Sequence, residues 1–257
     1  MDLNLSKPLC FFDLETTGTN IAKDRIVEIA ILKVFPNQNK ESMTLRVNPE
    51  MPIPKEVSEI HGIYDKDVEN EPTFKALAPK IYNFIKDADL AGYNSNRFDI
   101  PLLAEEMLRA EVDFDMKNAV KIDVQEKEKK KEKRTLEAAY KFYCDKDLTD
   151  AHSAEADTNA TYEVLKSQLD CYEDLENNTK WLAEFSAHKK FADFAGMVQY
   201  NKNGQEIFGF GKHKGKKVED VLDREPGYYS WIQNADFPLY TKKVLTAIKL
   251  RKLSTKS

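Results

Sequence analysis

The order of apolar and polar positions divides the first half of the chain into a run of strands followed by alternating helices and strands. Apolar, β-branched segments at residues 9–15, 25–35 and 42–47 predict three strands. The short turns between them favour an antiparallel meander. The first segment is apolar without regular alternation at its start, so we expect this strand to be buried on both faces.

After the meander, the apolar period switches between that of a helix and that of a strand. Helices are predicted near residues 73–86 and 101–110, and short strands at 90–93 and near 120–124. Strands followed by alternating helices are typical of an α/β or α+β domain with a mixed sheet.

Helical patterns recur at residues 136–143, 154–169 and 180–194, and a polar, Gly-containing segment at 201–205 is predicted to be a linker or a hairpin tip. The charge run at 126–134 is predicted to be a solvated loop or helix end. The resulting organisation is an amino-terminal domain (1–177), a helical linker (178–205) and a small carboxy-terminal module (206–257).

Composition indicates a folded protein with a sizeable core. The chain has 257 residues, 41% of them hydrophobic, and its 14 Phe and 11 Tyr are spread along its length. No apolar run approaches the ~18–20 residues of a membrane span, and the first ten residues lack a secretory signal pattern, so we expect a cytoplasmic location and no membrane partner. Three widely spaced cysteines indicate neither a disulfide framework nor a structural zinc site.

Charge changes the picture only when it is divided by segment. The formal net charge of −5 argues weakly against a nucleic-acid partner. However, residues 202–257 contain 12 Lys and Arg against 6 Asp and Glu, whereas residues 1–201 contain 27 against 38. Residues 202–257 therefore carry +6 and residues 1–201 carry −11, so the carboxy-terminal module is the candidate for a basic binding surface.

Asp13 and Glu15 are the first candidate functional residues. They stand two positions apart in the first strand, so both side chains leave on one face, about 6.5–7 Å apart along the strand. Two carboxylates in an apolar strand are costly unless a cation compensates them, and such a pair can flank Mg²⁺ or Mn²⁺ ions. The alternative is an exposed strand end at which both acids form ordinary salt bridges.

Two further acids and a histidine extend this set. Asp99 stands just ahead of a predicted helix, and Asp157 shares a helical face with Thr161, Val164 and Leu165, which should pack on the sheet. Local alternatives are a helix cap for Asp99 and a favourable helix-dipole position for Asp157. His152 precedes that helix, with Ser153 as a candidate N-cap, and near a metal cluster it could accept a proton from water. His61, His188 and His213, taken singly, are interpreted as structural.

Three segments resemble the exonuclease motifs of the DEDDh family, the 3′-to-5′ exonucleases related to the proofreading epsilon subunit of bacterial DNA polymerase. They are FDLETTG from Phe12, YNSNRFDIPLL from Tyr93 and HSAEAD from His152. Their order, spacing and context agree over about 165 residues. A histidine five residues before the last aspartate is the mark of this branch of the family.

The resemblance implies an α/β, RNase H-like fold with a mixed five-stranded sheet flanked by helices. It also implies that Asp13, Glu15 and Asp157 bind one divalent ion, that Asp13 and Asp99 serve a second, and that His152 is the general base. By the same resemblance, Thr17 would lie near the 3′-hydroxyl, Leu14 and Phe98 near the terminal base, and Asn94 and His61 are weaker substrate-binding candidates.

The carboxy-terminal module resembles the small domain attached to some exonuclease X-type nucleases, on the segment FGKHKGKKVEDVLDREPGYYSWI from Phe210. Its lysines are candidate substrate-binding residues: Lys212, Lys214, Lys216 and Lys217. Its aromatic side chains are expected to form the core that a module of about 50 residues needs, although stacking on bases is an alternative. They are Phe208, Phe210, Tyr228, Tyr229, Trp231, Phe237 and Tyr240.

These observations predict a metal-dependent 3′-to-5′ exonuclease that acts on single-stranded or frayed DNA ends in repair or proofreading, with Mg²⁺ or Mn²⁺ as cofactor and a polymerase as a candidate partner. One alternative is trimming of RNA 3′ ends, because nothing in the sequence indicates contact with a 2′-hydroxyl. Another is a non-catalytic scaffold that binds nucleic acid or a polymerase. A scaffold has no need for clustered acids, which disfavours this alternative.

Overall fold

The computed structural model describes residues 2–114, 120–127, 135–149, 151–186 and 191–254, and they form two compact units. The first unit comprises residues 1–20 and 24–187, and the second comprises 21–23 and 188–257. This division differs from the predicted one, because the described residues of the predicted linker are shared between the two units. The helical part of the predicted linker belongs to the first unit, and its hairpin belongs to the second.

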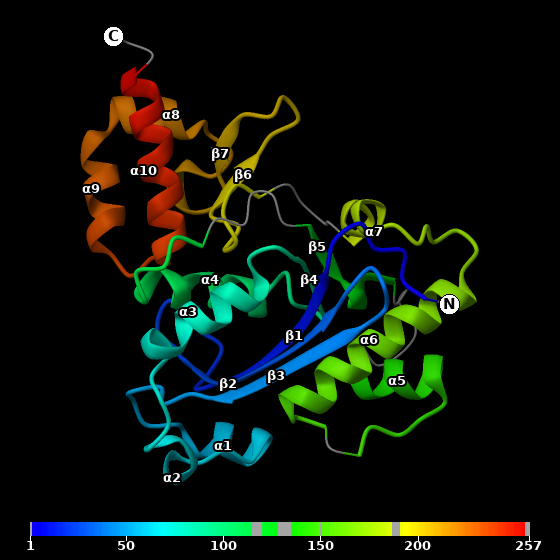
Figure 1. The fold of residues 1–257 in the computed structure, drawn as a ribbon. Coiled ribbons are helices and arrows are strands. Elements are labelled where there is room, and N and C mark those ends of the chain that lie inside the picture. Colours follow the sequence, from blue (N-terminus) through cyan, green and yellow to red (C-terminus); the bar gives the residue numbers. More distant parts are fainter. Residues whose placement is uncertain (1, 115–119, 128–134, 150, 187–190, 255–257) are drawn as a thin grey trace. The chain divides into compact units, whose positions relative to one another are not determined.

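A five-stranded mixed sheet forms the centre of the first unit (Figure 1). Its spatial order is β3-β2-β1-β4-β5, with β1–β2 and β2–β3 antiparallel and β1–β4 and β4–β5 parallel. The predicted meander and mixed sheet are thus confirmed. The strands are β1 (Leu9–Thr16), β2 (Ile26–Val34), β3 (Lys40–Arg46), β4 (Asp89–Gly92) and β5 (Lys121–Asp123).

Helices cover both faces of this sheet, with α5 and α6 over one face and α3 and α4 over the other (Figure 1). The longer helices are α3 (Phe74–Ile85), α4 (Asp99–Arg109), α5 (Leu136–Cys144), α6 (Ala154–Cys171) and α7 (Thr179–Ser186). The short ones are α1 (Lys55–His61), α2 (Asp65–Val68) and the 3₁₀ turn η1 (Val124–Lys127). Most of the charge run at 126–134, and His188, lie outside the described residues.

Strand β1 is buried on both faces over its first four residues, as predicted, and its odd-numbered side chains point toward α6. Leu9 and Phe11 join the core cluster that contains Val164 and Leu165 of α6. Phe11 also packs edge-to-face on Tyr162, with ring centroids 5.3 Å apart. Because side chains alternate along a strand, this packing sets the direction of the next odd-numbered residues, Asp13 and Glu15.

In its described residues, the second unit consists of a β-hairpin and the helices α8, α9 and α10 (Figure 1). Its elements are β6 (Val198–Tyr200), β7 (Glu206–Phe208), the 3₁₀ turn η2 (Gly211–His213), α8 (Val218–Arg224), α9 (Pro226–Asn234) and α10 (Leu239–Ser254). Residues 201–205 form the hairpin turn, one of the two predicted alternatives. A separate core holds the unit together; it consists of Val198, Phe208, Val218, Val221, Leu222, Ile232, Leu245 and Ile248.

Of the helix predicted over residues 180–194, the described residues up to Ser186 are helical, whereas residues 191–194 are not. Phe191 instead forms a bridge with Gln199, and the Ala192 N–H donates to the Val198 carbonyl over 2.8 Å. The Asp193 carboxylate accepts hydrogen bonds from the Val198 N–H and the Thr241 hydroxyl. These bonds to the hairpin replace the helical ones, so tertiary pairing overrides the helical period here.

Gly209, which follows β7, must be glycine because its backbone lies against the loop before β6. A Cβ atom at this position would lie 2.2 Å from the Gly196 carbonyl oxygen and 2.5 Å from Gln199 Nε2. The Gly209 N–H also donates to the Met197 carbonyl over 2.8 Å. This contact fixes the path of the chain from Phe208 to Phe210.

Within the described residues, no helix combines the length and apolar character needed to cross a bilayer.

Candidate active site

Three carboxylates converge where β1 meets the first turn of α6. Asp13 and Glu15 continue the α6-facing stripe of β1, and Asp157 lies in the first turn of α6. Ligand oxygens of these three residues all lie within 4.8 Å of one another. The face predicted for Asp157 is correct, since Thr161, Val164 and Leu165 on the same helix are buried.

Asp99 adds a fourth acid from the other side of the sheet. It is the first residue of α4, its exposed fraction is only 7%, and it does not act as the N-cap, which is Phe98. Its carboxylate accepts a hydrogen bond from the backbone N–H of Leu14, the residue that follows Asp13. The charge on Asp99 in turn raises the pKa of Asp13. Asp99 therefore lies beside the three-acid group without belonging to the tightest cluster.

Burial raises the pKa of every acid in this set, and repulsion from other members of the set adds to the rise at Asp13 and Glu15. The pKa of Asp13 lies well above its ordinary value, first because of burial and then because of Asp99 and its other acidic neighbours. Burial is also the main reason that the pKa of Glu15 rises to about 8, that of Asp99 to about 7 and that of Asp157 to about 6. The protein alone does not compensate these charges.

The donor set fits a divalent cation. Asp157 Oδ1 is buried and has no hydrogen-bond partner among the described residues, which is a costly arrangement for a carboxylate oxygen. Carboxylate oxygens are the ligands preferred by hard divalent ions, and a cation would offset the repulsion that raises the pKa values. Asp13, Glu15 and Asp157 are the residues placed to hold it.

His152 is connected to this cluster through its backbone. Its N–H donates to Asp157 Oδ2 over 3.2 Å, and its φ of 69° places it in the left-handed region. Its side chain is 52% exposed, with Nε2 3.8 Å from Glu137 Oε1. Ser153 occupies the N-cap position of α6, as predicted, although its side chain makes no capping hydrogen bond. The histidine thus precedes the helix beside the acids, with an accessible imidazole.

The remaining candidates of the first unit occupy different environments. Leu14 is buried, and Phe98 and Asn94 are half-buried. The Thr17 hydroxyl is engaged internally, because it donates to Asp24 Oδ1 and accepts from the Arg25 N–H, each over 3.0 Å. His61 is half-buried; burial is the main cause of its lowered pKa, and the charge of His152 acts on it, which places His61 on the acid-cluster side.

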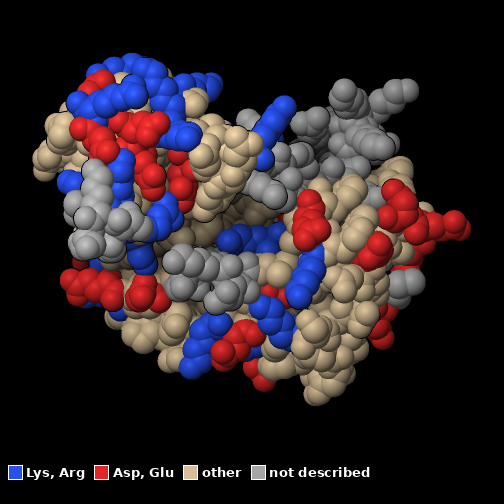
Figure 2. All heavy atoms as spheres, turned by 90° about the horizontal axis from the view of Figure 1, so that it is seen from above, with Lys and Arg blue, Asp and Glu red and all other residues tan. Residues whose placement is uncertain are grey.

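The four candidate lysines of the second unit are all exposed around η2. Lys212 forms an ion pair with Glu225, with Nζ 2.7 Å from Oε2. Lys214, Lys216 and Lys217 form no ion pair within the described part of the chain. On the face shown in Figure 2, Lys and Arg side chains are interspersed with Asp and Glu over this unit, so that face is not a purely basic surface.

Two acids that the sequence analysis missed also act on the site. Glu28 of β2 pairs in register with Glu15 and raises the pKa values of Asp13 and Glu15. Asp123, at the end of β5, accepts hydrogen bonds from the backbone N–H groups of Asn94 (2.9 Å) and Asn96 (3.3 Å) and so fixes the segment before Asp99. The sequence signal was only that each is an acid in an apolar strand segment, which does not by itself show that it lies at the site.

Comparison with known proteins agrees with this arrangement. Residues 10–165 match the family model described as Exonuclease (RNase_T), and residues 208–236 match the model of the exodeoxyribonuclease X-like C-terminal region. The first match spans more than half of the chain, which therefore belongs to the Exonuclease family. The predicted family and enzyme class are confirmed.

Two curated relatives illustrate how differently the similarity extends. Exodeoxyribonuclease 10 of Escherichia coli (strain K12) is 28% identical over 232 residues, covering 88% of this chain and 90% of that protein. The PolC-type DNA polymerase III of Clostridium perfringens (strain 13 / Type A) is 27% identical over 194 residues, covering 69% of this chain but only 13% of the polymerase.

A solved structure shows the same fold. The crystal structure of E. coli exonuclease I in complex with a dT13 oligonucleotide matches with a TM-score of 0.55 and 20% identity, covering 64% of this chain and 41% of that one. The predicted mixed five-stranded exonuclease fold is therefore confirmed.

Proposed function

We propose that this chain is a divalent-metal-dependent 3′-to-5′ exonuclease that removes nucleoside 5′-monophosphates from single-stranded or frayed DNA ends in the cytoplasm. The observation that carries the proposal is the convergence of Asp13, Glu15 and Asp157 within 4.8 Å in an Exonuclease-family domain. DNA as substrate is supported by the relative named exodeoxyribonuclease 10, which aligns with 88% of this chain.

Asp13, Glu15 and Asp157 would hold one Mg²⁺ or Mn²⁺ ion, and Asp13 with Asp99 would serve a second. Paired ions of this kind, when bound, neutralise charge on the attacking and leaving oxygens of a phosphodiester. The raised pKa values of the acids support this assignment, because a bound cation favours their charged forms.

His152 would be the general base. Its accessible imidazole accepts a proton from the attacking water, whose oxygen forms a new bond to the terminal phosphorus. The bond from that phosphorus to the 3′-oxygen of the preceding nucleotide then breaks in line, and the 3′-oxygen takes a proton from solvent. The products are a nucleoside 5′-monophosphate and a strand with a new 3′-hydroxyl.

Leu14 and Phe98 would lie under the terminal base, Thr17 would position the strand end through its backbone, and Asn94 and His61 are further substrate-binding candidates. Lys212, Lys214, Lys216 and Lys217 would attract phosphates. A polymerase partner, and with it proofreading rather than repair, is supported by the matches to the PolC-type polymerase and to DNA polymerase III subunit epsilon.

A hydrolysis assay with a 3′-labelled DNA oligonucleotide tests the proposal. The wild-type chain should release labelled nucleotide with Mg²⁺ or Mn²⁺ and stop when chelator is added. Asp13→Asn should lower the rate about 1,000-fold or more, because it removes a charged ligand whose loss costs several kcal/mol of transition-state stabilisation.

Glu155→Gln is the matched control, since this acid lies in the same first turn of α6 but is exposed. It should retain normal activity. Full activity of Asp13→Asn, or activity that survives chelation, would overturn the proposed mechanism. Faster cleavage of an RNA oligonucleotide of the same sequence would assign the chain to RNA 3′-end trimming, and no hydrolysis of either would favour the scaffold.

A further inference from the structure

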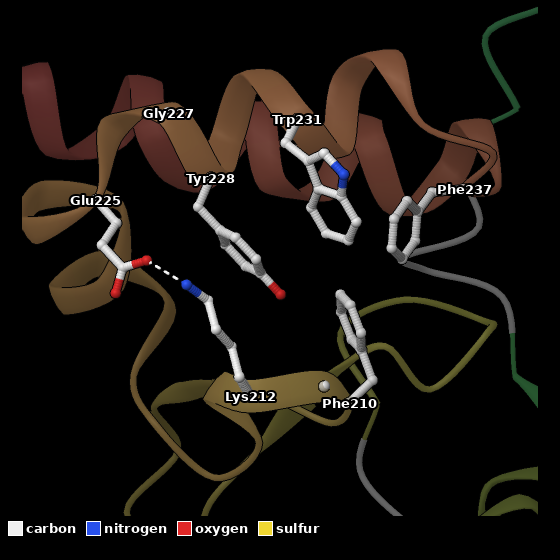
Figure 3. A pocket seen from close by; sticks show the side chains of 8 residues that line it. Phe210, Lys212, Glu225, Gly227, Tyr228, Trp231 and Phe237 are labelled. Carbon is white, nitrogen blue, oxygen red and sulfur yellow. Dashed lines mark hydrogen bonds and ion pairs between the residues drawn. The ribbon is translucent and has the colours of Figure 1, made fainter.

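The second unit carries an open aromatic pocket of about 660 Å³ that the acid-cluster chemistry does not use. Its walls come from the segment around η2 and from helix α9 and the turn after it. Figure 3 shows the rings of Phe210, Tyr228, Trp231 and Phe237 pointing into the same space, with Lys212 at one side bonded to Glu225. Gly211 and Gly227 complete the lining.

The rings form a continuous aromatic wall. Trp231 stacks on Tyr228 with centroids 5.3 Å apart and an angle of 25°, and it meets the edge of Phe237 at 5.5 Å. Phe237 contacts Phe210 at 5.1 Å, and Phe210 packs on the fully buried Phe208. The wall is thereby anchored in the core of the unit.

Trp231 was expected in the core of the unit, but its side chain is largely exposed. Its exposed fraction is 52%, although folding normally hides most of so large an apolar side chain. The core of the unit is formed without it, by Phe208, Ile232 and aliphatic residues. Trp231 therefore offers a flat indole face to a ligand, with little cost in fold stability if it is changed.

Charge around the pocket favours a polyanion. The η2 segment that supplies Phe210 and Lys212 continues directly into Lys214, Lys216 and Lys217, which are exposed and unpaired within the described residues. The acid in the lining, Glu225, is already bonded to Lys212 (2.7 Å) and to His213 Nε2 (3.2 Å). The border of the pocket therefore offers exposed ammonium groups and no unengaged carboxylate from the lining, which disfavours a cationic ligand.

We propose that this pocket binds an unpaired nucleobase of single-stranded DNA, which stacks on Trp231 while the adjacent lysines contact the flanking phosphates. Aromatic stacking combined with a positively charged border is how proteins hold single strands without sequence preference. The inference rests on the proposed function, because it takes the exonuclease substrate as the ligand, and it assigns a second contact point to that strand.

Tryptophan fluorescence of the full chain can follow this contact directly. The chain has two tryptophans, so a Trp181→Phe background makes Trp231 the sole reporter. Titration with an oligothymidylate of about twelve nucleotides, in chelator to prevent hydrolysis, should quench Trp231 emission with the same midpoint as the fluorescence anisotropy of a labelled oligonucleotide.

Trp231→Ala, tested with native Trp181, should weaken oligonucleotide binding about tenfold, and Trp231→Phe should restore most of it, because base stacking contributes about 1–3 kcal/mol. Tyr200→Ala is the matched control, since Tyr200 is a 40% exposed aromatic of the same unit outside the pocket. A backbone without bases separates stacking from phosphate attraction, so an abasic oligonucleotide should bind wild type and Trp231→Ala equally.

Unchanged affinity in Trp231→Ala together with unquenched Trp231 emission would overturn the inference. Quenching by an acidic, phenylalanine-containing peptide but not by the oligonucleotide would also overturn it and assign the pocket to a protein partner. Hydrolysis by the same wild-type preparation with Mg²⁺ separates the two claims. Active enzyme with an unresponsive Trp231 contradicts this inference alone, whereas quenching without hydrolysis contradicts the proposed function alone.

Discussion

The two units break the usual distribution of side chains in opposite ways. The first unit places four acids in or beside its core, where burial raises their pKa values. The second unit leaves a tryptophan half in solvent, beside other rings that do not cover it. Unexpected burial of charge indicates a ligand of opposite charge, and unexpected exposure of an aromatic face indicates a ligand with an apolar face.

The two anomalies also differ in what a mutation would affect. Removing a buried acid changes the charge that a cation experiences, so it should act on the chemical step. Removing an exposed ring or a surface lysine changes contact with the strand, so it should act on binding. Variants that separate the rate constant from affinity can therefore test whether chemistry and binding are divided between the units.

The largest effect on the chemical side, after loss of a metal ligand, is expected for His152→Gln. Loss of a general base should lower kcat about 100-fold with little change in KM, because the imidazole acts on the attacking water rather than on the bound strand. Steady-state kinetics on a single-stranded DNA substrate measure both constants. An equal loss in binding, or no loss in kcat, would show that His152 is not the base.

A smaller effect on the binding side is expected when Lys214, Lys216 and Lys217 are all changed to Ala. Affinity for single-stranded DNA should fall about tenfold near 0.1 M salt, and the slope of log affinity against log salt should decrease by about 2, because each phosphate contact contributes about 0.7. Fluorescence anisotropy in chelator at several salt concentrations measures both. The same change at Lys202, Lys242 and Lys249 of that unit controls for net charge, and an equal effect there would remove any special role of the η2 lysines.

The smallest effect concerns stability of the metal-free protein. Acids whose pKa values are raised on folding bind protons more tightly in the folded state, so the contribution of these acids to stability should be greatest near pH 4 and fall as the pH rises toward 8, where Glu15 ionises. Asp157 and Asp99 lose their protons within this range, near pH 6 and 7. Each kcal/mol lost lowers the Tm of a domain this size by about 2–4 °C.

Thermal unfolding in chelator and in Mg²⁺ checks this expectation. Mg²⁺ should raise the Tm, and the rise should grow with pH, because ionised acids bind the cation better. Asp13→Asn should make the metal-free curve flatter. A Tm in chelator that rises between pH 5 and 8 would contradict the interpretation that the acids are uncompensated.

The acid cluster was predictable because its signal is local. Asp13 and Glu15 stand in one strand with a strict period of two, and Asp157 shares a helical face with apolar residues, so the sequence fixes their directions once each element is identified. Asp123 was missed because its role depends on which strand lies beside β4, and Glu28 because its role depends on the register opposite Glu15. Those are tertiary facts.

Predictions for the second unit were less accurate for the same reason. The helical period over 180–194 could not reveal that Phe191 and Ala192 pair with the hairpin instead. Tryptophan is a residue type expected in a core. Only the three-dimensional packing of residues such as Ile232 and Phe208 shows that the core of the unit is formed without Trp231. A small unit with many aromatic residues leaves several ways to divide them between core and surface.

Gly209 shows how a position can be intolerant to substitution without taking part in catalysis or binding. Its missing side chain lets the backbone approach the Gly196 carbonyl and so sets the path of the wall that ends in Phe210. In a saturation-mutagenesis screen, replacements here should be among the least tolerated in the unit, although Gly209 does not line the aromatic pocket. The intolerance would then result from the close approach of two main-chain segments. A screen alone would not distinguish it from a role in ligand binding.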